Sequence, residues 1–236
     1  MQKLAVTDCK LKVLDVGYAA EDDDDDGEDE VDVDSLRPLV GPHTEELGLA
    51  EFALKDKEVA SLIEPCLGLK KIDLTGLRKV GGSTLDTLAR CCPLLEELRA
   101  ERCHCPTSTL NVLLSGCPNL RILVIGVCEK VADVALPNGD GVEILRLECQ
   151  TKEDMLAATT LKAQRLAILW DDQFDDVDNP FKDAPTCDAF AAGLVAATAT
   201  ELELGLPALS ESILTAAGTR LSSVRVVSVY TATERR

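Results

Sequence analysis

Aromatic residues are scarce in this sequence, with one Trp, two Tyr and four Phe among 236 residues. Proteins that hold nucleic acid stack bases on aromatic rings and neutralise phosphates with Lys and Arg. Here 42 Asp and Glu oppose 24 Lys and Arg, which gives a formal net charge of −18. The shortage of aromatics and of positive charge argues against nucleic acid as a direct partner. It favours a protein partner with a basic surface.

Long apolar runs are missing as well. No stretch reaches the roughly 18 apolar residues that span a bilayer. The first twenty residues mix lysines with aspartates and contain no signal-peptide core. We therefore expect no membrane association. Ten cysteines in an unsecreted chain indicate reduced thiols and a cytoplasmic location, with the nucleus or a cytoskeletal or ciliary assembly as alternatives.

Catalytic patterns are absent from the sequence. The only two histidines, His43 and His104, lie in no nucleophile, zinc or phosphate motif, and no glycine-rich phosphate loop follows an apolar segment. Asp and Glu are abundant but form no recognisable constellation. We therefore expect a protein that is not an enzyme and that has no catalytic residues, cofactor or resident metal.

A repeat is the clearest positive signal. Segments 92–103 and 117–128 both begin with Cys-Pro, carry leucines at the same two positions and end in Cys, at a constant offset of 25 residues. A fixed period of 20 to 50 residues is typical of solenoids, and L-x-x-L-x-L-x-x-C/N is the leucine-rich-repeat pattern.

The L-x-x-L-x-L template matches nine segments, whose first positions step by 33, 25, 26, 25, 22, 21, 36 and 22 residues. The nine apolar triads are Leu11/Leu14/Val16, Thr44/Leu47/Leu49, Leu69/Ile72/Leu74, Leu95/Leu98/Ala100, Leu120/Leu123/Ile125, Val142/Leu145/Leu147, Ala163/Leu166/Ile168, Ala199/Leu202/Leu204 and Leu221/Val224/Val226. Apolar residues at helical spacing lie between them. The pattern predicts an α/β leucine-rich-repeat solenoid, a single domain over 1–236 with eight or nine repeats. A curved parallel sheet would form its concave side, and helices or 3₁₀ turns its convex side.

The block with Cys92-Pro93 and Cys117-Pro118, the paired leucines that follow, and Cys103 and Cys128 resembles the cysteine-containing subclass of leucine-rich repeats. That subclass forms the substrate-binding half of many F-box proteins and also occurs in related proteins without an F-box. The likeness covers about residues 58 to 150, and no F-box segment is visible before the repeats. The resemblance implies a curved solenoid that binds protein.

Two steps between triads are longer than the rest because of acidic insertions, at 21–34 and 171–186. Set against a calcium loop, the first insertion places Val33 where a bidentate Glu is required, so a structural calcium site is not expected. We consider it either a solvated acidic loop or an acidic rim that attracts a basic partner. The residues of this acidic rim are Glu21, Asp22, Asp23, Asp24, Asp25, Asp26, Glu28, Asp29 and Glu30.

The cysteines allow a metal site or a structural role. Cys66, Cys92 and Cys117 recur at 26 and 25 residues where outer helices end, and Cys103 and Cys128 recur at the turn after a strand. Buried thiols behave as small apolar groups. We interpret these five as buried repeat positions, and expect the remaining Cys91, His104 and Cys105 to be exposed.

Side chains that flank each triad are expected on the concave face, because strand residues alternate between faces. They form an apolar patch beside arginines, and such patches mark binding surfaces. The predicted partner-binding residues are Arg99, Ile122, Val124, Ile144, Arg146, Leu169 and Trp170. The alternative is that the second acidic insertion folds back through Phe174 or Phe181 and covers the patch.

These features together predict a non-catalytic protein-recognition module that acts as an adaptor or as a subunit of a multi-protein complex. Two alternatives remain open. The chain could be the substrate-recognition part of a ubiquitin ligase, or an acidic inhibitor or chaperone of a basic protein.

Overall fold

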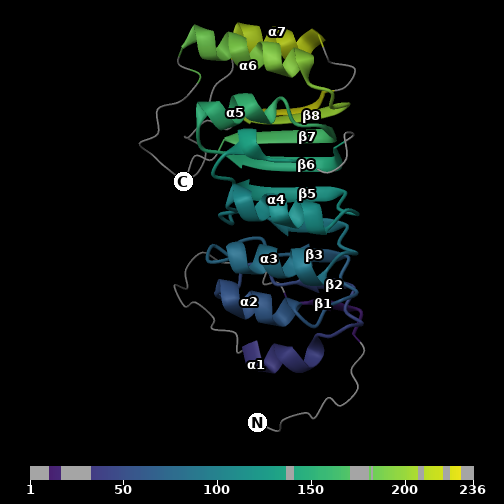
Figure 1. Cartoon of the computed structure of the whole chain (residues 1–236). Helices are drawn as coiled ribbons and strands as arrows, with labels where there is room; N and C mark the ends of the chain where they lie inside the picture. Colours follow the sequence, from purple (N-terminus) through teal and green to yellow (C-terminus); the bar gives the residue numbers. More distant parts are fainter. Residues whose placement is uncertain are drawn as a thin grey trace. The chain divides into compact units, whose positions relative to one another are not determined.

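The computed structural model describes residues 11–16, 33–136, 141–170, 181, 183–206 and 210–219, together with the backbone of 224–229. Contacts within the chain define two compact units, Met1–Arg121 and Ile122–Arg236. In both, parallel strands alternate with helices (Figure 1). The α/β class predicted from the sequence is confirmed, and the strands do not close into a barrel. The prediction of a single domain stays a prediction.

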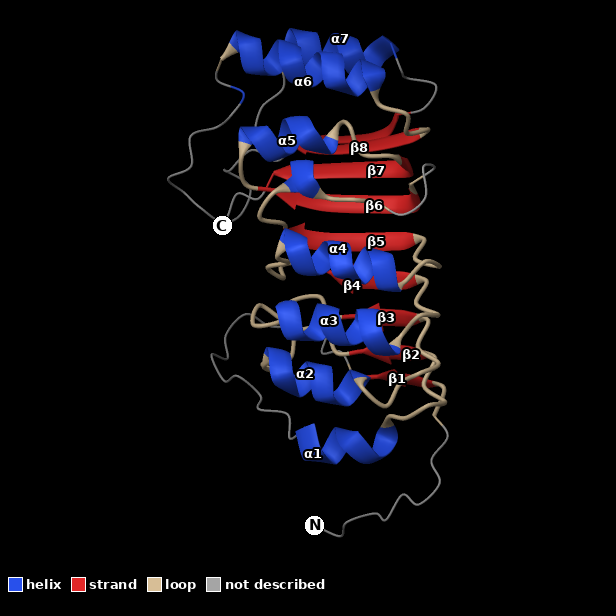
Figure 2. Cartoon of the chain, in the orientation of Figure 1, coloured by secondary structure: helices blue, strands red, loops and turns tan. Residues whose placement is uncertain are grey.

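The first unit has short strands and amphipathic helices. Its strands are β1 (Val13–Asp15), β2 (Glu46–Gly48), β3 (Lys71–Asp73) and β4 (Glu97–Ala100). Its helices are α1 (Val33–Leu36), the 3₁₀ turn η1 (Arg37–Leu39), α2 (Asp56–Ile63), α3 (Gly82–Cys91) and α4 (Thr107–Gly116). Each strand pairs in parallel with the next one in the chain. Helices α2, α3 and α4 lie on one side of these strands (Figure 2).

Backbone hydrogen bonds in this unit recur with the period of the sequence. After each of α2, α3 and α4, the N–H of a triad leucine donates to the carbonyl of the cysteine three residues earlier, at 3.1 Å in all three cases. These pairs are Leu69 with Cys66, Leu95 with Cys92, and Leu120 with Cys117. The 25- and 26-residue period is therefore also a structural period within this unit.

The strands of the first unit also end in the same way. Glu51, Gly76 and Arg102 follow β2, β3 and β4 and adopt the left-handed conformation, with φ of 64°, 79° and 60°. They are 25 and 26 residues apart. The residue 25 positions further on is Val127, which is the last residue of the next strand. A β-branched residue is strongly disfavoured at positive φ, so extended backbone reaches this position, which is a left-handed turn in the earlier repeats.

The second unit has longer strands. They are β5 (Ile122–Val127), β6 (Val142–Cys149), β7 (Ala163–Trp170), β8 (Glu201–Leu206) and β9 (Val224–Val229). The connecting elements are the 3₁₀ turn η2 (Val131–Asp133), α5 (Lys152–Ala158), α6 (Ala184–Ala196) and α7 (Glu211–Thr219). Neighbouring strands again pair in parallel and in chain order.

The triads supply the core of each unit. In the first unit, Leu47, Ile72 and Leu98 share one register row and are at most 2% exposed. In the second, Leu123, Leu145 and Leu166 do the same. Helix leucines such as Leu62, Leu88 and Leu113 are fully buried. Burying a leucine side chain stabilises the folded state by about 1.5–3 kcal/mol, so these rows are a main source of stability.

The two acidic insertions lie largely outside the described residues. Of the segment 21–34, the structure describes Val33 and Asp34, which form the start of α1. Of 171–186, it describes Phe181 and 183–186, and α6 begins at Ala184. All nine residues of the acidic rim are outside the described residues, so its predicted role stays a prediction.

Candidate functional site

The candidate site is a groove on the open face of the first unit's strands. We call this surface the sheet face; it is opposite to the side that carries Leu47, Ile72 and Leu98. The groove on this face has a volume of about 190 Å³. The lining residues are Val13, Leu14, Asp15, Glu46, Leu47, Gly48, Lys71, Ile72, Asp73, Glu97 and Arg99. Strand alternation places every second one of these residues toward solvent, and Val13 is 53% exposed.

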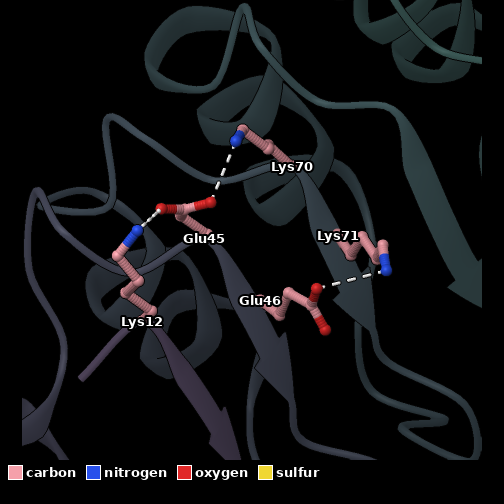
Figure 3. A network of polar contacts seen from close by, with 5 residues as sticks. All are labelled: Lys12, Glu45, Glu46, Lys70 and Lys71. Atoms are coloured by element: carbon pink, nitrogen blue, oxygen red, sulfur yellow. Dashed lines mark hydrogen bonds and ion pairs between the residues drawn. The ribbon is translucent and has the colours of Figure 1, made fainter.

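The first row of the sheet face runs through Val13, Glu46, Lys71 and Glu97, which are register partners on successive strands. Lys71 Nζ lies 3.1 Å from Glu46 Oε1, and both side chains remain nearly half exposed (Figure 3). Glu97 instead pairs with Arg99 of the second row, at 2.6 Å between Nε and Oε1. Both cations of the groove are therefore held by carboxylates of the same surface.

The second row, formed by Asp15, Gly48, Asp73 and Arg99, has a glycine between two carboxylates. A Cβ on Gly48 would collide with the carboxylate of Asp15, so only glycine lets that side chain lie over β2. Asp73 Oδ1 accepts a hydrogen bond from the N–H of Thr75 at 2.9 Å, which fixes its direction. Counting both rows, the groove has four carboxylates and two cations.

The amino-terminal ends of these strands are joined by alternating charges. Lys12 Nζ and Lys70 Nζ bind the two oxygens of Glu45 at 2.7 and 2.9 Å (Figure 3). The hydrogen bonds and charges of the two lysines lower the pKa of Glu45 to about 2. The same carboxylate raises the pKa of Lys70. Because these groups are exposed to solvent, the network orients the strand ends more than it stabilises the fold.

The opposite ends of the strands are joined across Gly76. The guanidinium of Arg102 binds the carboxylate of Glu51, and a Cβ on Gly76 would collide with that carboxylate. Gly76 therefore suits this position in two ways, since glycine adopts a positive φ without strain and leaves room for the Glu51 side chain. The strands of the sheet face are thus joined by charged pairs at both ends.

The predicted partner-binding residues are divided between the units. Arg99 belongs to the first unit and lines the groove. In the second unit, Ile122 pairs with Ile144, and Val124 with Arg146, on adjacent strands. Leu169 lies two strands away from Val127 on the same register row. The structure therefore brings Ile122, Val124, Ile144, Arg146 and Leu169 onto one face, which the strand alternation predicted.

Two of these five residues are already buried. Val124 is 3% exposed and Leu169 is 8% exposed, whereas Ile122, Ile144 and Arg146 are half-buried. Trp170 is in step with the buried Leu166 and Ile168 of β7, and its register partner Cys149 is also buried. Alternation therefore directs Trp170 to the face opposite that of Leu169. The sheet face of the first unit is the more accessible of the two surfaces.

Phe181 does not cover the predicted patch. Its ring makes an edge-to-face contact with Phe190 of α6, with ring centroids 5.2 Å apart. The thiol of Cys187 donates to the carbonyl of Phe181 at 3.4 Å. Phe181 is thus packed among helix residues of the second unit. Phe174, the other residue proposed as a cover, is outside the described residues.

The repeat cysteines form a series of buried thiols. Cys92 Sγ donates to the carbonyl of Cys66 at 3.6 Å, and Cys117 Sγ donates to the carbonyl of Cys92 at 3.4 Å. Burial raises the pKa of Cys92 to about 12 and that of Cys117 to about 11. Cys103 Sγ donates to the carbonyl of Leu74 at 3.1 Å. The predicted burial of the five repeat cysteines is confirmed, since each of them is at most 3% exposed.

The expectation for the remaining cysteine-block residues is corrected in one case. His104 is exposed and Cys91 half-buried, but Cys105 is only 2% exposed, so its predicted exposure is wrong. Cys105 alternates with His104 and therefore points inward with Cys103. None of the nine cysteines in the described part of the chain forms a disulfide. Nor does any cluster of His, Cys, Asp or Glu among the described residues have a geometry suited to a metal ion.

Sequence reasoning missed a contact between neighbouring repeats at Asp56. The carboxylate of Asp56, in α2, accepts hydrogen bonds from the N–H groups of Gly81, Ser83 and Thr84 at 2.9 to 3.0 Å. It thereby caps the start of α3, which has no cap from its own Gly81. Partial burial raises the pKa of Asp56, but the hydrogen bonds outweigh it and the pKa is lowered. The available signal was the Gly81-Gly82 pair, which leaves that helix without a capping side chain.

No protein-family model matches the chain, and no curated protein matches it either. Among the helices that the structure describes, none has both the length and the apolar composition that crossing a membrane requires.

Proposed function

We propose that this chain is a leucine-rich-repeat protein that recognises another protein, without catalysis, through the sheet face of its first unit. It would serve as an adaptor or as a subunit of a larger assembly. The repeat assignment rests on the recurring strand, turn and thiol contacts at 25 and 26 residues. The function is inferred from one observation, the groove in which charged side chains of β1 to β4, two of them in ion pairs with glutamates, line the open face.

The size of the groove favours a protein over a small molecule. Pockets for small ligands usually have volumes of roughly 300–1,000 Å³ and are mostly apolar. This groove is about 190 Å³ and is dominated by charged side chains on neighbouring strands. A surface of that kind can form many polar contacts spread over an area, and protein–protein interfaces have contacts of this type.

The charges indicate the chemistry of the partner surface. Four carboxylates and two cations line the groove, and Lys71 and Arg99 are each paired with a glutamate of the same surface. A partner with a mixed but predominantly basic surface would complement this pattern. Complementary charge speeds association and discriminates among partners more than it adds affinity.

The test is to isolate the full chain with its bound proteins and to measure each captured protein by quantitative mass spectrometry. Glu46→Lys with Asp73→Lys reverses two of the four carboxylates that would attract a basic partner. Glu64→Lys with Asp86→Lys is the matched control, because it makes the same change in charge at two exposed residues outside the groove. We expect the groove variant to lose the main partner by at least about tenfold, and the control to retain it. Equal capture by both variants would refute the proposal.

Salt dependence separates the two alternatives. An acidic inhibitor or chaperone would lose its basic partner steeply between low and high salt, and would also lose it when residues 21–30 are deleted. A ubiquitin-ligase adaptor would co-purify with ligase components as well as with its substrate. The sheet-face proposal predicts that the groove variant fails at both salt concentrations.

A further inference from the structure

Helix α6 differs from α2 and α3 in being apolar around its circumference. Its 13 residues include a single charged side chain, Asp188, whereas α2 has three in eight residues and α3 has two in ten. Phe190 and Leu194 bury its inner face, but most of its exposed positions are Ala, and Val195 is 55% exposed. A helix that is apolar all round is normally covered on more than one side.

A groove of about 810 Å³ runs along the exposed side of this helix, between α6 and α7. The two helices lie side by side within the second unit (Figures 1 and 2). Cys187, Ala191 and Ala216 are buried at its floor, and the exposed Ala192 and Thr215 rise at its sides. Small side chains on both helices leave room for a third helix to approach closely. An amphipathic helix that lies in an apolar groove is a common mode of protein recognition.

The charged residues that the structure describes along this groove have one sign. Asp183, Asp188 and Glu211 line it, and the described lining residues include no Lys, Arg or His. Asp183 already caps α6, since it accepts hydrogen bonds from the N–H and the hydroxyl of Thr186, both at 2.8 Å. Asp188 and Glu211 are exposed, one on each helix. They are therefore the two groups available to select an incoming helix by its charge.

Charge argues against two occupants from the chain itself. A second copy would bring the same carboxylates against Asp188 and Glu211, on a chain with a net charge of −18. The segment 171–180, which precedes the groove residue Phe181, contains five aspartates and no cation. Both would add repulsion between like charges in a poorly hydrated contact.

We propose that the groove between α6 and α7 binds an α-helix of a second protein. The contact face of that helix would consist of small or apolar residues, and Lys or Arg on its flanks would reach Asp188 and Glu211. This surface is separate from the sheet face, so either could fail while the other stands.

The test uses the full chain and two fluorescent helical peptides of about 15 residues. Both peptides have the same Ala and Leu face; one has Lys on its flanks and the other has Glu. Fluorescence anisotropy should show that the Lys peptide binds and the Glu peptide does not. Ala192→Arg fills the groove and should weaken binding of the Lys peptide by at least about tenfold. Ala189→Arg is the control, because Ala189 is exposed on the same helix but does not line the groove.

A charge reversal completes the design. Asp188→Lys with Glu211→Lys should exchange the preference, so that the Glu peptide binds and the Lys peptide does not. The proposal is overturned if neither peptide binds, if Ala192→Arg and Ala189→Arg have equal effects, or if the charge reversal leaves the preference unchanged. Light scattering that reveals a dimer lost with Ala192→Arg would also overturn it, in favour of a second copy as the occupant.

Discussion

The two units build parallel strands from the same apolar triad. They differ in the sheet face that lies opposite the triad. In the first unit the strands have three or four residues, and charged side chains occupy the open face. In the second unit the strands have six to eight residues, and Val124, Ala167 and Leu169 on the corresponding face are buried. The triad thus determines the core, and the residues between its members determine what each face offers.

The different strand lengths have a local cause. After each of β2, β3 and β4 the chain turns at a residue with positive φ, which lies two or three residues beyond the end of the strand. The corresponding Val127 lies in β5, where its side chain favours extended backbone. Short strands leave only two outward positions each, so the sheet face of the first unit is narrow and polar. Longer strands present a broader surface that apolar residues can fill.

The largest expected effect tests whether the triads contribute equally in both units. Leu98→Ala in the first unit and Leu145→Ala in the second each remove a side chain that is fully buried. We expect each to lower the free energy of unfolding by about 2–5 kcal/mol, measured by urea denaturation. Leu94→Ala is the control, because Leu94 is 47% exposed and should have little effect. If only one of the two variants lost stability, the triads would not contribute equally to the cores of the two units.

The next effect compares a charged helix cap with a neutral one. Asp56→Ala removes the carboxylate that caps α3, and we expect a loss of about 1–3 kcal/mol at neutral pH. Because the pKa of Asp56 is lowered on folding, its contribution is present above the ordinary carboxyl pKa. It disappears as the pH falls through the lowered value. Urea denaturation at several pH values measures this dependence.

The matched cap in the second unit is Ser210, whose hydroxyl accepts the N–H of Ile213 at 3.3 Å at the start of α7. Ser210→Ala should cost about 0.5–1 kcal/mol. That loss should not change with pH over the same range, since a hydroxyl does not titrate there. A pH-dependent difference between wild type and Ser210→Ala, or a constant one for Asp56→Ala, would contradict the assignment.

A smaller effect distinguishes the two faces directly. Val124 is 3% exposed and Val13 is 53% exposed, although both flank a triad. Val124→Ala should therefore lower the free energy of unfolding by about 1–2 kcal/mol, since two buried methyl groups are lost. Val13→Ala should change it by less than about 0.5 kcal/mol. Equal losses of unfolding free energy, measured by thermal or urea denaturation, would mean that the two sheet faces are buried to the same extent.

The smallest effect concerns the charges at the strand starts of the first unit. The carboxyl of Glu45 should titrate with a pKa of about 2 when followed by NMR. Lys12→Met with Lys70→Met should return this pKa toward its ordinary range, because both hydrogen-bond donors are removed. High salt should move it in the same direction, since exposed charges are screened. A pKa that does not respond to the two lysines would contradict the network.

Much of the core could be predicted from residue spacing. Leu98 and Leu123 are buried where the triads placed them, and Cys92 and Cys117 recur at buried turns. These features repeat, so each copy supports the others. The placement of Ile122 beside Ile144 also followed from alternation and register alone. Interactions that depend only on period and parity are thus accessible from the sequence.

The rest depends on contacts that the period does not encode. Asp56 caps a helix 25 residues further on, and the burial of Val124 depends on what lies above the strand. Alternation could have predicted that Cys105 points inward and that Trp170 points to the same face as Ile168. Each of these residues, however, lies at or next to a turn or a strand end. At such positions parity is easily misjudged by one residue.

The series of cysteine thiols gives the first unit a built-in reporter of opening. Only thiolates react readily with alkylating reagents, and the protonated, enclosed sulfurs of Cys92 and Cys117 are neither ionised nor reachable at neutral pH. Iodoacetamide would modify them only during excursions in which the turns between helix and strand separate. The labelling rate of each cysteine, measured by mass spectrometry, would therefore report how often its repeat opens locally, without any engineered probe.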